Sequence, residues 1–124
     1  MTADRKSDIS WVVNIEPDVA TRSVPSLSDY LSTSSGWTEA EFRSIDLPAA
    51  RITGGYWTGE PGRVEIDPWP YTEICSIISG RVAVTDFLGG RLEFGTGAAF
   101  MIPKGFAGAW ITLEPSAKLF LMVC

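Results

Sequence analysis

The chain contains no histidine among its 124 residues. This absence excludes Ser–His and Cys–His nucleophilic pairs and every histidine-ligated metal site. Acid–base chemistry would have to come from carboxylates, lysine, tyrosine or cysteine. Cysteine is also scarce. The two cysteines, Cys75 and Cys124, do not make a disulfide framework, and we expect both to be free thiols in a reducing compartment.

Positive charge is equally limited. Ten Lys and Arg residues stand against fifteen Asp and Glu residues, which gives a net charge of −5. A polyanionic partner needs a basic surface, so we expect no nucleic-acid partner, and an anionic membrane surface is disfavoured for the same reason. No run approaches the roughly 20 apolar residues of a membrane span. Because the N-terminus also lacks the apolar core of a signal peptide, we expect a cytoplasmic protein.

Short apolar runs separated by Gly and Pro are present throughout the second half of the chain. They alternate as half-buried strands do, and no long amphipathic helix lies between them, which argues against a parallel βαβ sheet. We therefore expect an all-β fold of one domain spanning residues 1–124. Strands are expected at residues 51–57, 63–67, 72–78, 81–87, 91–94, 98–102, 109–113 and 118–124.

Residues 1–50 are more polar and less regular, and we expect them to form an N-terminal arm with extra strands, packed on a core made by residues 51–124. A short strand is expected at residues 11–15. One helical turn is expected within residues 25–31, with Ser26 or Ser28 as its N-cap. A second short helix is expected at residues 38–43, because Thr38 and Glu41 have the spacing of a capping box.

Two segments resemble the sequence motifs of the cupin superfamily. Gly62, Glu73 and Gly80 are spaced as in the first cupin motif, and the run from Gly97 through Pro103 to Gly105 is similar to the second. The resemblance extends to the small single-domain cupins related to ureidoglycine aminohydrolase. The segments that carry it are Gly55-Tyr56-Trp57, Pro61-Gly62, Glu73 to Val82, Pro103 to Gly105, Trp110, Leu113-Glu114-Pro115 and Lys118.

The resemblance implies a cupin-like antiparallel β-barrel, or jelly roll, with a pocket inside it, and pairing of two copies into a homodimer. The metal ligands of that family are absent. Pro68-Trp69-Pro70 stands where the His-x-His pair would lie, Gly108 stands near the last histidine position, and only Glu73 remains. One carboxylate does not hold a transition metal, so we expect neither a metal nor another cofactor.

The candidate site residues are those that would line the barrel. Glu73 is either a buried acid–base group with a raised pKa, an anchor for an amine or amide, or a structural carboxylate paired with Arg or Lys. Cys75 shares its face of the strand and is expected to be a packed thiol, as is Cys124 unless it is disordered. The candidate ligand-binding residues are Glu73, Trp57, Trp69, Tyr71, Cys75 and Trp110.

Two of these residues, Trp69 and Trp110, and the nearby Lys118 need separate comment. Trp69 lies between two prolines, so it is the aromatic residue we expect to be exposed at the barrel mouth or at an interface. Ordinary packing is the favoured reading of Trp110. Lys118 either pairs with an interior carboxylate or, as is commoner for lysine, points to solvent.

Three functions remain open at this stage. The favoured one is a cupin that binds a small polar metabolite without a histidine-ligated metal, with Glu73 as the anchor. The second is a degenerate or metal-independent enzyme, a lyase or amidohydrolase of the ureidoglycine type, with Glu73 as its catalytic residue. The third is a purely structural dimeric barrel with a filled interior.

Overall fold

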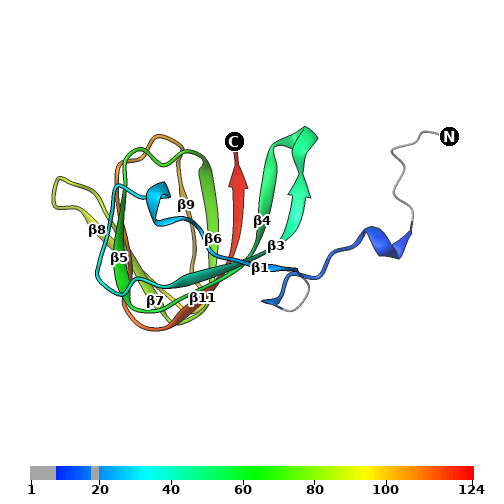
Figure 1. Cartoon of the computed structure of the whole chain (residues 1–124), viewed down its shortest axis with the longest axis horizontal. Coiled ribbons are helices and arrows are strands. Elements are labelled where there is room, and N and C mark those ends of the chain that lie inside the picture. Colours follow the sequence, from blue (N-terminus) through cyan, green and yellow to red (C-terminus); the bar gives the residue numbers. More distant parts are fainter. Residues whose placement is uncertain (1–7, 18–19) are drawn as a thin grey trace.

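Two antiparallel β-sheets make up the fold in the computed structural model, which describes residues 8–17 and 20–124 (Figure 1). Sheet A has six strands in the order β1 (Arg22–Ser23), β3 (Glu39–Leu47), β4 (Ile52–Gly59), β11 (Ser116–Val123), β6 (Thr72–Ser79) and β9 (Ala99–Ile102). Sheet B has five strands in the order β2 (Ser32–Thr33), β5 (Gly62–Ile66), β10 (Gly108–Thr112), β7 (Arg81–Thr85) and β8 (Arg91–Gly95). This arrangement confirms the expected all-β, antiparallel fold.

Short 3-10 helices punctuate the first half of the chain: η1 (Ile9–Trp11), η3 (Leu27–Asp29) and η4 (Pro48–Ala50). The expected turn within residues 25–31 is confirmed as η3, and the Ser28 backbone N–H donates to the Oγ of its N-cap, Ser26, at 3.3 Å. Within residues 8–17 and 20–124, no helix is long and apolar enough to span a membrane.

Two expectations for the first half of the chain are wrong. The strand expected at residues 11–15 is absent, because the chain there leaves η1 without pairing with either sheet. The helix expected at residues 38–43 is part of β3. That strand pairs with β4 from Glu39 opposite Gly59 to Leu47 opposite Ile52, with one irregularity between Phe42 and Ile45. The pairing of a nine-residue strand along its length stabilises this segment more than a helix cap would, because a capping box contributes only about 1 kcal/mol.

The core lies between the two sheets and is rich in aromatic residues. Glu73, Cys75 and Ile77 alternate inward on β6 and are all buried, as the sequence predicts. Trp57 and Trp110 meet edge to face with ring centroids 5.6 Å apart, which is a favourable geometry for two aromatic rings. The inner faces of both sheets thus surround an aromatic interior into which a few polar side chains project.

The turn between β6 and β7 depends on Gly80. Its φ of +91° lies in the left-handed region, and a Cβ there would come within 2.2 Å of Ser116 Oγ and 2.5 Å of the Pro115 carbonyl oxygen. Only glycine adopts this φ without strain and also leaves out the Cβ for which there is no room. The tight turn holds β6 and β7 in different sheets, and so it helps to fold the chain into a barrel.

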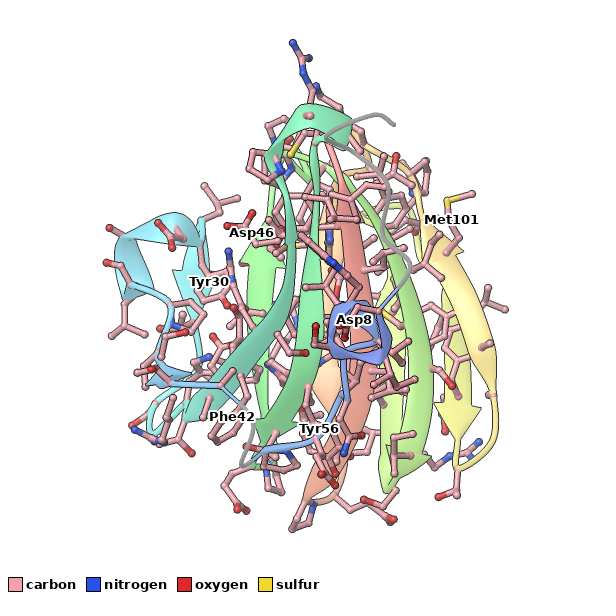
Figure 2. The ribbon with its side chains drawn as sticks, turned by 90° about the vertical axis from the view of Figure 1, so that its right-hand side faces the viewer. Asp8, Tyr30, Phe42, Asp46, Tyr56 and Met101 are labelled. Carbon is pink, nitrogen blue, oxygen red and sulfur yellow. The ribbon has the colours of Figure 1, made fainter. Side chains whose placement is uncertain are left out.

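The outer face of sheet A is partly apolar. Ile74 on β6 and Met101 on β9 are cross-strand partners, and both side chains are exposed. Figure 2 shows Met101 pointing away from the edge of the barrel. The described N-terminal residues, including η1, extend away from the barrel (Figure 1), and in Figure 2 the turn of Asp8 lies in front of sheet A.

Candidate functional site

An ion pair lies inside the barrel, between two neighbouring strands of sheet A. Lys118 on β11 donates from Nζ to Glu73 Oε2 on β6 at 2.7 Å. In the strand register Lys118 lies opposite Ile77, whereas Glu73 lies opposite Met122, so the two side chains reach along the interior to meet. Their side chains are only 6% and 9% exposed, so both charges are removed from water.

Further contacts satisfy both charges. The Trp69 indole N–H donates to Glu73 Oε1 at 3.2 Å, and the Cys75 thiol donates to Oε2 at 3.3 Å. Lys118 Nζ lies 3.8 Å from the ring centroid of Trp110 and 4.8 Å from that of Trp57. An ammonium at these distances from ring faces gains cation–π attraction, which is largest where water is excluded.

Both members of the pair are held in their charged forms. Burial by itself raises the pKa of Glu73, but the charge of Lys118 and its hydrogen bond outweigh that effect, so the pKa lies below the ordinary glutamate value. Burial by itself lowers the pKa of Lys118, but the charge of Glu73 and its hydrogen bond raise it, and the pKa ends above the ordinary lysine value. Of the readings left open for Glu73, the carboxylate paired with a lysine is the one observed, and this pairing lowers the pKa of Glu73 where the acid–base reading required a raised one.

Cys75 is an unreactive thiol in this setting. Burial raises its pKa well above the ordinary cysteine value, and the neighbouring Glu73 charge adds to that effect, while Lys118 opposes it. Because the thiolate is the reactive form, a buried, protonated thiol is a poor nucleophile. Cys124 is exposed, and its backbone N–H donates to the Arg51 carbonyl oxygen at 3.0 Å.

A second group of acids lies on β3. Glu39 is 7% exposed and accepts three hydrogen bonds from neutral donors: one from the Tyr30 hydroxyl, one at 2.9 Å from the Trp37 indole N–H and one at 2.8 Å from the Trp57 indole N–H. Burial and the Glu39 charge raise the pKa of Tyr30, so its phenol keeps the proton that it donates. The β3 acids thus face the same interior as the ion pair.

Glu41 lies two residues further along β3 and is also buried. Its Oε2 accepts from Arg43 Nε at 2.6 Å, while the Arg43 side chain is 46% exposed. Glu41 therefore connects the barrel interior to a cation at the surface.

A small cavity separates the ion pair from the β3 acids. Its free volume is about 40 Å³, and it is not closed off from solvent. Such a volume accommodates on the order of three water molecules or a few atoms of a ligand. The residues that line it come from both sheets and the segments between them: Tyr30, Trp37, Glu39, Glu41, Trp57, Val64, Ile66, Trp69, Tyr71, Glu73, Trp110, Lys118, Phe120 and Met122.

The structure brings most of the predicted site residues together. Trp57, Trp69, Tyr71, Glu73 and Trp110 all line this one cavity, together with Lys118. Cys75 does not line it and reaches the site only through its hydrogen bond to the Glu73 carboxylate. Lys118 is buried and paired, so the commoner, solvated placement of a lysine does not apply here.

The expected exposure of Trp69 is wrong, since only 1% of its surface is accessible. The two flanking prolines do prevent a regular strand, as expected. The loop is nevertheless held in place by backbone hydrogen bonds: the Trp69 N–H donates to the Phe106 carbonyl at 2.7 Å, and the Gly105 N–H donates to the Trp69 carbonyl at 2.8 Å. The indole is thereby turned inward to Glu73.

Eight residues that line the cavity were not predicted: the apolar Val64, Ile66, Phe120 and Met122 of the barrel strands, and four others, Tyr30, Trp37, Glu39 and Glu41. The last four come from the segment treated as an arm. The signal for the two acids was the alternation of Glu39, Glu41 and Arg43 with less polar residues, which places them on one face of a strand. The capping-box spacing of Thr38 and Glu41 predicts a helix over the same residues and so conceals this alternation.

The interior does not fit the transition-metal centre of histidine-bearing cupins. Glu73 is the one acid retained at a ligand position, and an ammonium already lies 2.7 Å from its Oε2. In the described part of the chain, no three Cys, Asp or Glu side chains form a group able to hold a metal ion. A cation bound at Glu73 would have to displace Lys118 into an aromatic interior.

Comparison with known proteins agrees with this architecture. The model of the EutQ-like cupin domain matches residues 47–120. Among solved structures, the Clostridium difficile EutQ protein superposes with a TM-score of 0.70 at 19% identity, covering 95% of this chain and 91% of that one. A structure described as that of a "putative ethanolamine utilization protein q" of Salmonella typhimurium gives a TM-score of 0.61 at 16% identity, covering 69% of each chain.

A protein of unknown function from Pseudomonas syringae gives a TM-score of 0.67 at 19% identity, and covers 94% of this chain but 46% of that one. At such identities the structural likeness establishes the fold. No curated protein matches the chain. The resemblance to the cupin superfamily is confirmed, while none of these matches supports the ureidoglycine aminohydrolase branch in particular.

Proposed function

The chain belongs to the EutQ-like cupin domain family, and from this premise we propose that its barrel binds a small polar metabolite without a histidine-ligated metal. The observation that carries the proposal is the buried Glu73–Lys118 pair at the edge of a cavity. Ligand pockets combine apolar walls with a few fixed polar groups, and this interior has that composition. The aromatic rings supply the walls, and the paired charges supply directional contacts.

Binding is better supported than catalysis by the same pair. An effective general acid or base has a pKa near the working pH, so that it gains and loses its proton readily. Here the pKa of Glu73 is lowered and that of Lys118 is raised, so each group stays charged near neutrality. This disfavours the alternative of a degenerate enzyme of the ureidoglycine type that uses Glu73 as its acid–base residue.

The proposal is tested by ligand-induced thermal stabilisation. The purified protein is heated with a panel of small polar compounds that covers amines, amides, hydroxy acids, polyols and ureido compounds. A compound that binds only the folded state at a hundred times its Kd adds about 2.7 kcal/mol to the free energy of unfolding. Ethanolamine is included, since one structurally similar protein is described as an ethanolamine utilization protein.

The Glu73→Gln variant is expected to lose the stabilisation, measured relative to its own melting temperature. Glu93→Gln is the matched control, because it makes the same chemical change in an exposed ion pair on β8. If Glu73→Gln does not fold, the double variant Glu73→Gln with Lys118→Met replaces it. Stabilisation by no compound of the panel would contradict binding and favour a filled, structural barrel. Turnover of a ureido compound that is lost in Glu73→Gln would favour the enzyme.

A further inference from the structure

The charges around the cavity do not balance. Its lining carries three carboxylates, Glu39, Glu41 and Glu73, and one ammonium, Lys118. Lys118 is committed to Glu73, and Arg43 reaches Glu41 from the surface. Within the described part of the chain, no Lys or Arg lies within ion-pairing distance of Glu39, so one buried carboxylate has only neutral donors around it. Buried charges are normally paired, and an interior with a surplus of one sign attracts the opposite sign.

The polar groups left over are two carboxylates with unused acceptor positions and one hydroxyl that can donate or accept. Glu41 uses Oε2 for Arg43, and its Oε1 has no hydrogen-bond partner among the described residues. The carboxylate of Glu39 offers about four acceptor positions and uses three of them. The Tyr71 hydroxyl also lines the cavity and has no partner in the described part of the chain. A ligand that donates several hydrogen bonds suits this set, whereas an anion would meet like charges.

The walls of the cavity are also rich in aromatic rings. Trp37 and Trp57 line the cavity beside the β3 acids, and their indole N–H groups both donate to Glu39. The same interior already holds one ammonium against rings, since Lys118 Nζ lies 3.8 Å from the centroid of Trp110. Ring faces attract ammonium groups most strongly where water is excluded.

We propose that the ligand is a small organic ammonium ion, whose charged head binds between the β3 acids Glu39 and Glu41 and the adjacent indole rings. The inference rests on the proposed binding function and names the class of its ligand. A free volume of about 40 Å³ accommodates a primary ammonium head and one or two carbons. Because the cavity is not closed off from solvent, the rest of a longer amine can extend outward. Glu39 is then the residue that selects a positively charged ligand in this cavity.

The test compares three probes of nearly equal size and different charge: ethanolamine, ethylene glycol and glycolate. Binding to the wild-type protein is measured by titration calorimetry and by the melting temperature at neutral pH. We expect ethanolamine to bind and to raise the melting temperature, with neither effect for the neutral or the anionic probe. Glu39→Gln is expected to weaken ethanolamine binding at least about tenfold, since it removes a charged hydrogen-bond acceptor. The Glu93→Gln control, outside the cavity, is expected to leave binding unchanged.

Each of the other outcomes shows which part of the proposal is wrong. Equal binding of ethylene glycol or glycolate would overturn the ammonium class and leave the binding function standing. Binding of a compound of the wider panel that carries no amine, but of none of the three probes, would do the same. Stabilisation by Mg²⁺ or Ca²⁺ alone that is lost in Glu39→Gln would assign the acids to an inorganic cation. Unchanged ethanolamine binding in Glu39→Gln would remove Glu39 from the site. If that variant does not fold, Glu41→Gln and the three-probe comparison on the wild type decide the question.

Discussion

Removing one charge from the Glu73–Lys118 pair should cost far more stability than removing both. In Glu73→Gln the ammonium of Lys118 remains buried without its anion, and in Lys118→Met the carboxylate of Glu73 remains without its cation. Both side chains are less than 10% exposed, so the few water molecules that the cavity holds replace the lost partner only in part. Breaking a buried pair in this way costs about 3–5 kcal/mol.

The double variant should recover most of that loss. Glutamine keeps an acceptor for the Trp69 indole, and methionine keeps an apolar stem against the ring of Trp110. Replacing both charges of a buried pair is often close to neutral, so we expect the double variant to be more stable than either single variant. An unfolding entropy of about 2.1 cal/mol/K per residue makes 1 kcal/mol worth about 4 °C in Tm for a chain of this length. Each single variant should therefore melt about 12–20 °C below the wild type.

Urea unfolding followed by tryptophan fluorescence and far-ultraviolet circular dichroism measures the four free energies of this cycle. Glu93→Gln serves as a fifth, exposed control and should change the free energy of unfolding by no more than about 0.5 kcal/mol. Costs below about 1 kcal/mol for both single variants would show that the pair behaves as a surface ion pair. A double variant as unstable as the sum of the two singles would show that the charges do not interact. Either result would refute the reasoning.

Three further predictions follow from the same structure. Because the folded-state pKa of Glu73 is lowered, the ionised carboxylate contributes its full stabilisation above the ordinary value of 4.5, and this contribution is lost as the pH falls below that value. Urea titrations from pH 7 to pH 3 should therefore show a smaller decrease in the free energy of unfolding for the double variant than for the wild type. Ellman's reagent should modify Cys124 but not Cys75 in the folded protein, and both in urea; two rapid equivalents in the native state would contradict the burial of Cys75. If Ile74 and Met101 form part of a homodimer interface, Met101→Asp should halve the mass measured by light scattering, whereas an unchanged mass would place the interface elsewhere.

The barrel strands could be predicted from the sequence because each carries its own local signal. The inward alternation of Glu73, Cys75 and Ile77 and the turn at Gly80 are both visible in the residue order. The segment at Glu39–Leu47 was missed because its structure depends on distant pairing with β4, which a local capping pattern does not report. Long-range pairing decides strand formation more than intrinsic preference does.

The sequence predicted the site residues of the later strands, but not those of residues 30–41. The positions that line the cavity on the later strands follow from alternation, as at Trp57 and Trp110. The pairing of Glu73 with Lys118 was one of the open alternatives, but the sequence did not favour it, because the two residues are not opposite one another in the strand register and an outward lysine is commoner. The burial of Trp69 likewise depends on hydrogen bonds to a loop far along the chain, which no local pattern encodes.

The position of β11 in the middle of sheet A has a consequence for biosynthesis. This strand is inserted between β4 and β6, pairing Ile52 with Val123 on one side and Thr72 with Val123 on the other. Until residues 116–123 have left the ribosome, the two parts of sheet A have no strand to join them, and the aromatic interior stays open. We therefore expect the barrel to close only after residues 116–123 have been synthesised. In the meantime the nascent chain presents unpaired strand edges of the kind that chaperones protect from aggregation.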